Sequence, residues 1–271
     1  MTPLNQINQI YLKREDQNPT GSAKDRAIVK QIKNLIANKY DRAVISSTGN
    51  AAISAIHYCQ KFNIPLTIFL SPKVQTAKLN IIKKLCPHII FSQKPISDAF
   101  KFSKINNSYY LRQSTDLSAQ EGYQNISREL LEQLPQVSSI FVPVGSGTTL
   151  LGISRTLPSK TKIFAVQPAS HCPISSVFDS NYKPENITVT DALSVKSLPL
   201  KTQLISTIKK TGGQGIVVQN QQVIDALSYL NQNNILSSAE GALAYAGLQK
   251  ALSQKIDIGS YPVVLITGTK R

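Results

Sequence analysis

Short apolar runs alternate with amphipathic stretches along nearly the whole chain. The apolar runs have the length of single strands and lie at residues 42–45, 66–70, 88–91, 139–144, 162–166 and 262–266. Between them, apolar residues recur with helical spacing at 27–39, 51–62, 78–85, 122–133 and 221–231. A helix between two strands carries the chain back across the sheet, so that successive strands pair in parallel. The alternation therefore predicts an α/β fold with parallel-stranded, twisted sheets covered by helices.

Size and composition narrow the class of protein. The chain has 271 residues, of which 41% are hydrophobic and 17% charged, and this is enough for a large core in one or two domains. No apolar run approaches the roughly 18 residues of a membrane-spanning helix, and the first residues do not read as a secretory signal. We therefore expect a cytoplasmic protein with no membrane partner. Three cysteines without a Cys-x-x-Cys spacing argue against both a disulfide scaffold and a metal site.

The chain is strongly basic, with 30 Lys and Arg residues against 15 Asp and Glu residues and a net charge of +15. If this positive charge were gathered in one segment, it would favour a nucleic-acid partner, because lysines that neutralise phosphates release counterions. Here the basic residues are spread along the chain and form no long cluster. We expect no specific nucleic-acid partner.

Two strand-to-helix turns are rich in small and hydroxyl-bearing residues. The first turn, 46–52 (SSTGNAA), and the second, 145–149 (GSGTT), each follow a predicted strand. Ligands of parallel α/β sheets bind at the carboxyl ends of the strands, where both turns would lie. The glycines of GSGTT let the backbone approach a ligand, and the following helix start offers free N–H groups and a positive dipole end. The second turn therefore suits a phosphate, although an ordinary strand-to-helix turn accounts for it equally well.

Two common phosphate-binding loops do not fit the second turn. A P-loop needs Lys followed by Ser or Thr after its second glycine, and this chain reads GSGTTLLG. A dinucleotide-binding turn needs GxGxxG and an acidic residue at the end of the next strand, where this chain has Gln167. A smaller phosphorylated cofactor fits the turn better.

The segment 12–27 (LKREDQNPTGSAKDRA) places a lysine at the start of a helix. Residues 18–21 (NPTG) predict a turn, and Ser22 is expected to cap the helix that follows. Lys24 would then lie in the first helical turn, where the positive end of the helix dipole favours a neutral amine. Schiff-base chemistry needs such an amine. Taken alone, a surface lysine is the simpler interpretation.

Together these segments resemble the fold-type II pyridoxal-phosphate enzymes, a superfamily that includes threonine synthase, cysteine synthase and threonine dehydratase. The resemblance rests on five motifs in the same order, and it runs from about Leu12 to the C-terminus. The motifs are LKREDQNPTGSAKDRA, SSTGNAA, VGSGTT, SSAEGA (237–242) and LITGTK (265–270). It implies pyridoxal 5′-phosphate as cofactor, a small amino acid as substrate and a homodimer.

The resemblance also implies roles by position. Lys24 would hold the cofactor as a Schiff base and act as the base at the substrate Cα, Asn50 would bind the 3′-oxygen of the pyridine ring, and Thr267 would face the ring nitrogen. The cofactor phosphate would be bound by Gly145, Ser146, Gly147, Thr148 and Thr149. The substrate carboxylate would be received by Ser47, Thr48 and Gly49. A ring nitrogen that faces a hydroxyl makes the cofactor a weaker electron sink, which suits removal of the α-proton with prompt loss of a β or γ leaving group.

The superfamily fold implies two domains for this chain. A large cofactor-binding domain would comprise residues 1–39 and 111–271, and a small domain of residues 40–110 would move to close over the substrate and exclude water.

Within the superfamily the motifs resemble threonine synthase most, which converts O-phosphohomoserine to threonine. Three positions depart from that pattern. Ala23 replaces the usual aromatic residue before the lysine, and Ala119 and Asp116 stand where threonine synthases bind the substrate phosphate with Arg and Asn. Cysteine synthase-like chemistry and β-elimination by a dehydratase or ammonia-lyase stay open, and the segment 116–123 (DLSAQEGY) makes Asp116 a candidate acid that contacts the substrate. A binding protein without catalysis is the remaining alternative.

Overall fold

The computed structural model describes residues 1–74, 76–85, 88–190, 193 and 198–270. The chain forms two compact units. The terminal unit comprises residues 1–23 and 123–271, and the inserted unit comprises residues 24–122. No helix within the described ranges is long and apolar enough to cross a membrane. The closing movement expected of residues 40–110 stays a prediction.

The inserted unit is built on a four-stranded parallel sheet. Its strands follow the order β5 (Ile89–Phe91), β4 (Leu66–Leu70), β3 (Ala43–Ile45) and β6 (Tyr109–Tyr110). All three pairings are parallel, and Val44 of β3 lies opposite Thr67 on one side and Tyr110 on the other. The carboxyl ends of the four strands therefore meet at one edge of the sheet.

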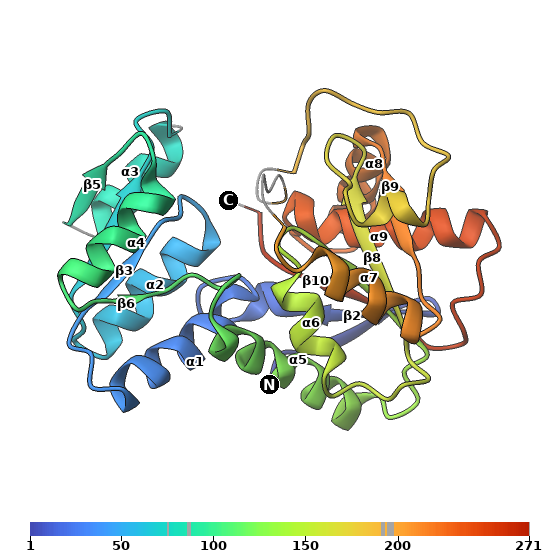
Figure 1. Cartoon of the computed structure of the whole chain (residues 1–271). Coiled ribbons are helices and arrows are strands. Elements are labelled where there is room, and N and C mark those ends of the chain that lie inside the picture. The colour runs from blue at the N-terminus through green and yellow to red at the C-terminus, as the bar shows by residue number, and fades with distance from the viewer. Residues whose placement is uncertain (75, 86–87, 191–192, 194–197, 271) are drawn as a thin grey trace. The chain divides into compact units, whose positions relative to one another are not determined.

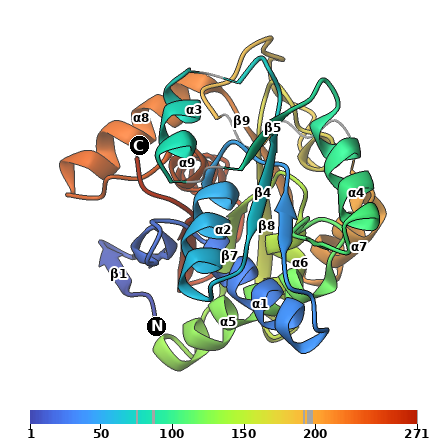
Figure 2. The same ribbon diagram turned by 90° about the vertical axis from the view of Figure 1, so that its left-hand side faces the viewer.

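Helices cover both faces of this sheet, and Figure 2 shows α2 and α3 on one side of β4 and α4 on the other. Ile45 packs with α1 (Lys24–Ala37), α2 (Asn50–Lys61) and α3 (Thr76–Leu85), whereas Val44 packs with Ala99 of α4 (Pro95–Ile105). Neighbouring residues of β3 thus serve opposite faces, as the two-residue period of a strand requires.

The terminal unit contains a six-stranded sheet. The strand order is β1 (Leu4–Ile7), β2 (Ile10–Arg14), β10 (Pro262–Ile266), β7 (Ser139–Pro143), β8 (Lys162–Pro168) and β9 (Gly215–Val218). Only the β1–β2 pairing is antiparallel among these strands. Every residue of β7 and β10 is buried, because helices cover both faces of a parallel sheet. The predicted α/β fold with parallel sheets is confirmed.

Helices lie in front of and behind this sheet in Figure 1. Behind it, α8 (Asn220–Gln232) and α9 (Ala239–Ser253) form an apolar cluster with Phe141, Phe164 and Val264. In front lie α6 (Thr148–Ser154) and α7 (Lys201–Lys210), and the chain enters this unit along α5 (Leu117–Gln133). α9 packs closely against β8 at Gly247. A Cβ atom on Gly247 would stand only 2.6 Å from the Val166 side chain.

A buried lysine ties β2 to α5. Lys13 is fully buried, and its Nζ donates to the Thr2 carbonyl (2.8 Å), to Glu129 Oε2 (3.0 Å) and to Gln133 Oε1 (2.9 Å). These acceptors replace the water that the ammonium group loses on folding.

Glu129→Ala is expected to lower the free energy of unfolding by about 3 kcal/mol, because it removes a carboxylate that pairs with the buried Lys13 ammonium. The control is Glu121→Ala on the same helix, which breaks an ion pair with Lys30 whose side chains are both about half exposed. Exposed pairs contribute at most about 1 kcal/mol. Urea denaturation of both variants measures the difference, and equal losses would contradict this account of Lys13.

Candidate active site

The carboxyl edge of the terminal unit's sheet gathers two of the predicted segments. β10 lies beside β7, the strands run parallel, and Val264 pairs with Phe141. By this register Thr267, the first residue after β10, lies beside Val144, which leads into Gly145. Adjacent strands are about 4.8 Å apart. Thr267 and the loop 145–149 therefore leave the sheet side by side.

The loop 145–149 has the backbone of an anion-binding turn. Gly147 has φ +83° and is the N-cap of α6, so the N–H groups of the first helical turn have no acceptor within the helix. A Cβ atom on Gly147 would stand 2.2 Å from Leu204 Cδ1, so a side chain at this position would also displace a buried residue. The Ser146 and Thr148 hydroxyls lie 3.0 Å apart and form one hydrogen bond. Free N–H groups and clustered hydroxyls at a glycine turn fit a phosphate.

The C-terminal stretch joins three of the sequence motifs within the terminal unit. Ala23 N–H donates to the Thr267 carbonyl (2.9 Å), and Thr269 N–H donates to the Gly21 carbonyl (3.0 Å). On the other side, Ser238 N–H donates to the Gly268 carbonyl (2.7 Å). The segment 267–269 is therefore hydrogen-bonded both to the NPTGSAK motif and to the SSAEGA motif. The next residue along the chain after Ala23 is Lys24.

Lys24 begins α1, as predicted, and the residue after it is held firmly. The Asp25 carboxylate is buried and accepts a hydrogen bond from Ser54 Oγ (2.6 Å) in the middle of α2. Burial, aided by the Asp25 carboxylate, raises the pKa of Tyr58 to about 12, so the phenol stays neutral beside it. These contacts fix the first turn of α1 against α2.

The turn 46–50 follows β3 at the carboxyl edge of the inserted unit's sheet. Gly49 is the N-cap of α2, Asn50 is its first residue, and Gly49 N–H donates to Ser47 Oγ (3.3 Å). Residues 46–50 are all half-buried. The turn therefore presents hydroxyls and a helix start at the edge where ligands of parallel sheets bind.

The family of the chain follows from comparison with known proteins. The model of the pyridoxal-phosphate dependent enzymes matches residues 1–268. The chain belongs to this family. As members of it, the chain and its relatives depend on pyridoxal phosphate, and the glycine turn at 145–149 fits the phosphate group of this cofactor.

Two curated members of the pyridoxal-phosphate dependent family match over 96% of this chain. One is an L-threonine ammonia-lyase from Thermotoga maritima, 26% identical, of which the match covers 67%. The other is a threonine synthase from Methanosarcina acetivorans, also 26% identical, of which the match covers 70%. Because the two relatives are equally identical to this chain, the comparison does not confirm the prediction that the chain resembles threonine synthase most.

The fold is also found in a solved structure. Maize serine racemase superposes with a TM-score of 0.86 at 19% identity, and the match covers 100% of this chain and 88% of that chain. At this identity the likeness concerns the fold alone.

Asp116 has a well-defined structural environment at the start of α5. Its Oδ1 accepts from the Ser118 N–H (2.9 Å) and the Ser118 hydroxyl (2.7 Å). Its Oδ2 accepts from Gln31 Nε2 (2.8 Å) and the Tyr109 hydroxyl (2.7 Å). The carboxylate thus joins α1, β6 and the start of α5, and its predicted contact with substrate stays a prediction.

The expected cap at Ser22 is wrong. Ser22 is fully buried, its Oγ has no hydrogen-bond partner in the part of the chain that the structure describes, and its backbone bridges to Gly268 instead. Sequence reasoning also overlooked Asp25. Asp25 follows the lysine directly, and its burial could have been suspected from its helix position.

Proposed function

We propose that the protein is a lyase that removes a β-substituent from a small hydroxyamino acid and leaves a 2-oxo acid and ammonium. The observation that carries the proposal is the main-chain hydrogen bond between Ala23 and Thr267. It keeps the residue before Lys24 next to the stretch that would face the pyridine nitrogen. This chemistry needs both the lysine and the partner of the ring nitrogen to reach the same cofactor molecule.

Some of the proposed cofactor-binding residues would hold the cofactor in place, and others would take part in the reaction. Gly145, Ser146, Gly147, Thr148 and Thr149 would bind the phosphate, and Asn50 would bind the ring 3′-oxygen. Lys24 would hold the cofactor and carry the proton between the substrate Cα and solvent. Thr267 would offer the ring nitrogen a hydroxyl. When bound, pyridoxal phosphate supplies an electron sink for the pair left at Cα after the proton has gone.

The proposed substrate site lies at the start of α2. Ser47, Thr48 and Gly49 would receive the substrate carboxylate through hydroxyl and N–H groups, since anions are stabilised at a helix start. The closing movement of residues 40–110, the homodimer and the substrate contact of Asp116 stay predictions that belong to this proposal.

Elimination is preferred to the synthase reaction because of residues 116 and 119. Threonine synthases that the sequence resembles bind a substrate phosphate with Arg and Asn there. In this chain Ala119 is fully buried, and both Asp116 oxygens accept hydrogen bonds from neighbouring side chains. Neither residue offers a positive charge to a phosphate. Threonine synthase chemistry is the second candidate, supported by the SSTGNAA motif and by the Methanosarcina relative.

Product analysis of the holoenzyme separates the candidates. With L-threonine or L-serine, we expect 2-oxo acid and ammonium in equal amounts. With O-phosphohomoserine, release of threonine and phosphate would instead support the second candidate. Bound cofactor without turnover of any of these amino acids would favour a binding protein and contradict the lyase proposal.

A further inference from the structure

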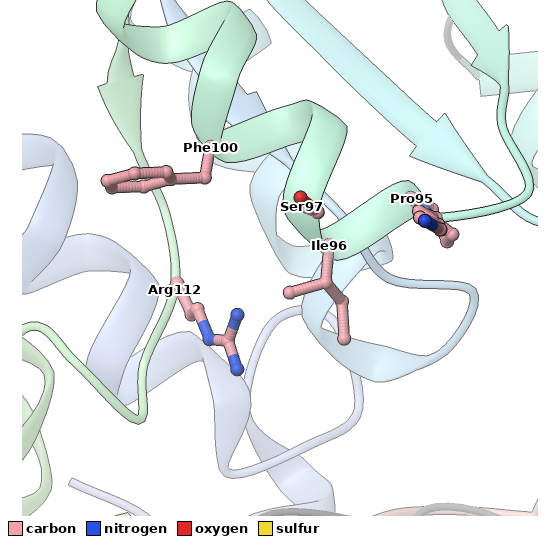
Figure 3. Close-up of a pocket in the computed structure, with 6 residues that line it drawn as sticks. Pro95, Ile96, Ser97, Phe100 and Arg112 are labelled. Carbon is pink, nitrogen blue, oxygen red and sulfur yellow. The ribbon is translucent and has the colours of Figure 1, made fainter.

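A pocket of about 480 Å³ lies in the inserted unit, outside the residues assigned so far. Figure 3 shows it at the first turn of α4, where the Arg112 side chain extends toward Ile96. Its apolar wall is formed by Ile96 and Phe100, whose exposed fractions are 49% and 50%. Lys94, Pro95 and Ser97 complete the lining.

This pocket opens at the same sheet edge as the turn 46–50. Lys94 follows β5 and Arg112 follows β6, so both lie beyond carboxyl ends of the inserted unit's sheet. β6 is the neighbour of β3, Val44 pairs with Tyr110, and Leu111 N–H donates to the Val44 carbonyl (2.9 Å). Beyond this bond the Arg112 N–H donates to the Tyr110 carbonyl (2.8 Å), so the chain turns at Leu111 and the ladder ends. Arg112 and Ser46 therefore both lie just past the carboxyl ends of two neighbouring strands, and adjacent strands are about 4.8 Å apart.

The positive charge in the pocket has no carboxylate partner in the described part of the chain. Arg112 Nε donates to the neutral Ser114 hydroxyl (3.2 Å), and neither Arg112 nor Lys94 forms an ion pair among the residues that the structure describes. Asp98, the acid in the first turn of α4, accepts a hydrogen bond from Ser92. A guanidinium group that has an apolar wall beside it and no counter-ion favours a ligand with an anionic group on a short apolar stem.

We propose that Arg112 selects substrates whose side chain carries a second anionic group. This inference rests on the proposed function, since the turn 46–50 would hold the α-carboxylate of the same molecule. The side-chain anion would pair with the Arg112 guanidinium, and Lys94 would add to the positive field. Ile96 and Phe100 would contact the carbon atoms that join the two ends. A carboxylate and a phosphate share this chemistry.

The kinetic test compares anionic with neutral substrates of the same reaction. The anionic arms are 3-hydroxyaspartate, which carries a carboxylate, and O-phosphoserine, which carries a phosphate; the neutral arm is L-threonine. Arg112→Gln is expected to lower kcat/KM for the anionic substrate by about 10- to 100-fold, mainly through KM, because a charged hydrogen bond is lost. The value for L-threonine should stay within about twofold, and Arg112→Lys should recover part of the loss.

Arg42→Gln is the matched control. Arg42 precedes β3 at the opposite edge of the same sheet, where it pairs with Asp41 (3.0 Å) and is exposed. This variant should not change either kcat/KM value. An equal loss for anionic and neutral substrates in Arg112→Gln, or no loss for either, would overturn the inference while leaving the lyase proposal standing.

A binding measurement covers the case in which no amino acid is turned over. Calorimetric titration of the holoenzyme with succinate, a dicarboxylate without an amino group, should give at least tenfold tighter binding than titration with butyrate. Arg112→Gln should abolish this difference, and Arg42→Gln should preserve it. Equal binding of the two acids by the unsubstituted protein would overturn the inference, whereas an absence of turnover alone would count against the proposed function.

Discussion

Lys24→Ala should lower kcat for β-elimination by about 10³-fold or more. Proton transfer by a positioned side chain contributes about 10²- to 10⁴-fold to an enzymatic rate, and in our proposal this lysine both holds the cofactor and moves the α-proton. Alanine keeps the helix, since it is the best helix former, so the loss would report chemistry and not folding. The measurement is the initial rate of 2-oxo acid formation with excess pyridoxal phosphate.

The matched control for this loss is Lys30→Ala. Lys30 lies on the same helix, and its exposed ammonium forms an ion pair with Glu121 (3.1 Å). Removing it should leave kcat within about twofold, because an exposed pair has little influence on stability or on distant groups. If both variants retain full activity, Lys24 is not the reactive lysine and the proposed mechanism fails.

Gly147→Ala should destabilise the protein by about 3 kcal/mol and weaken cofactor binding at least tenfold. A left-handed backbone at a residue with a side chain costs about 1–2 kcal/mol, and overpacking of a filled site costs about 1–3 kcal/mol. Gly147 incurs both costs, because its φ is +83° and its new Cβ atom would meet Leu204 at 2.2 Å. Urea denaturation of the apoprotein and titration with pyridoxal phosphate measure the two effects.

Gly212→Ala separates strain from crowding. Gly212 also has a left-handed backbone, with φ +67°, but a Cβ atom there would have no neighbour within 4 Å. It should lose only the strain energy and leave cofactor binding unchanged. In Gly147→Ala/Leu204→Ala the two losses should be less than additive, because the smaller residue makes room for the new methyl group. Tight cofactor binding by Gly147→Ala would contradict the assignment of residues 145–149 to the phosphate.

The fold was predictable where apolar residues recur with a clear period. Each of the six predicted strands overlaps an observed one, since parallel strands buried on both faces appear as continuous apolar runs. Helix α9 was missed because residues 241–248 are all buried, so no polar face marks the helical period. β2 was missed for the opposite reason, since its buried Lys13 and Arg14 look like surface residues until their partners Glu129 and Asp16 are known.

The sequence predicted which motifs form the candidate site, but not the contacts that bring them together. Five short segments pointed to one family, and the match of the family model to residues 1–268 agrees with them. The hydrogen bonds that bring Gly21 and Ala23 to the stretch 267–269 join residues more than 200 positions apart, and no local pattern encodes them. Arg112 likewise owes its place at the carboxyl edge of the inserted unit's sheet to the pairing of β3 with β6.

The central claim is that Lys24 holds the cofactor, and a peptide map tests it most directly. The holoenzyme would be treated with sodium borohydride, which fixes pyridoxal phosphate to the lysine that carries it, and then digested and analysed by mass spectrometry. We expect the added cofactor mass on the peptide that contains Lys24 and on no other lysine. The same mass on a different lysine, or its absence from every peptide of a cofactor-loaded protein, would contradict the account.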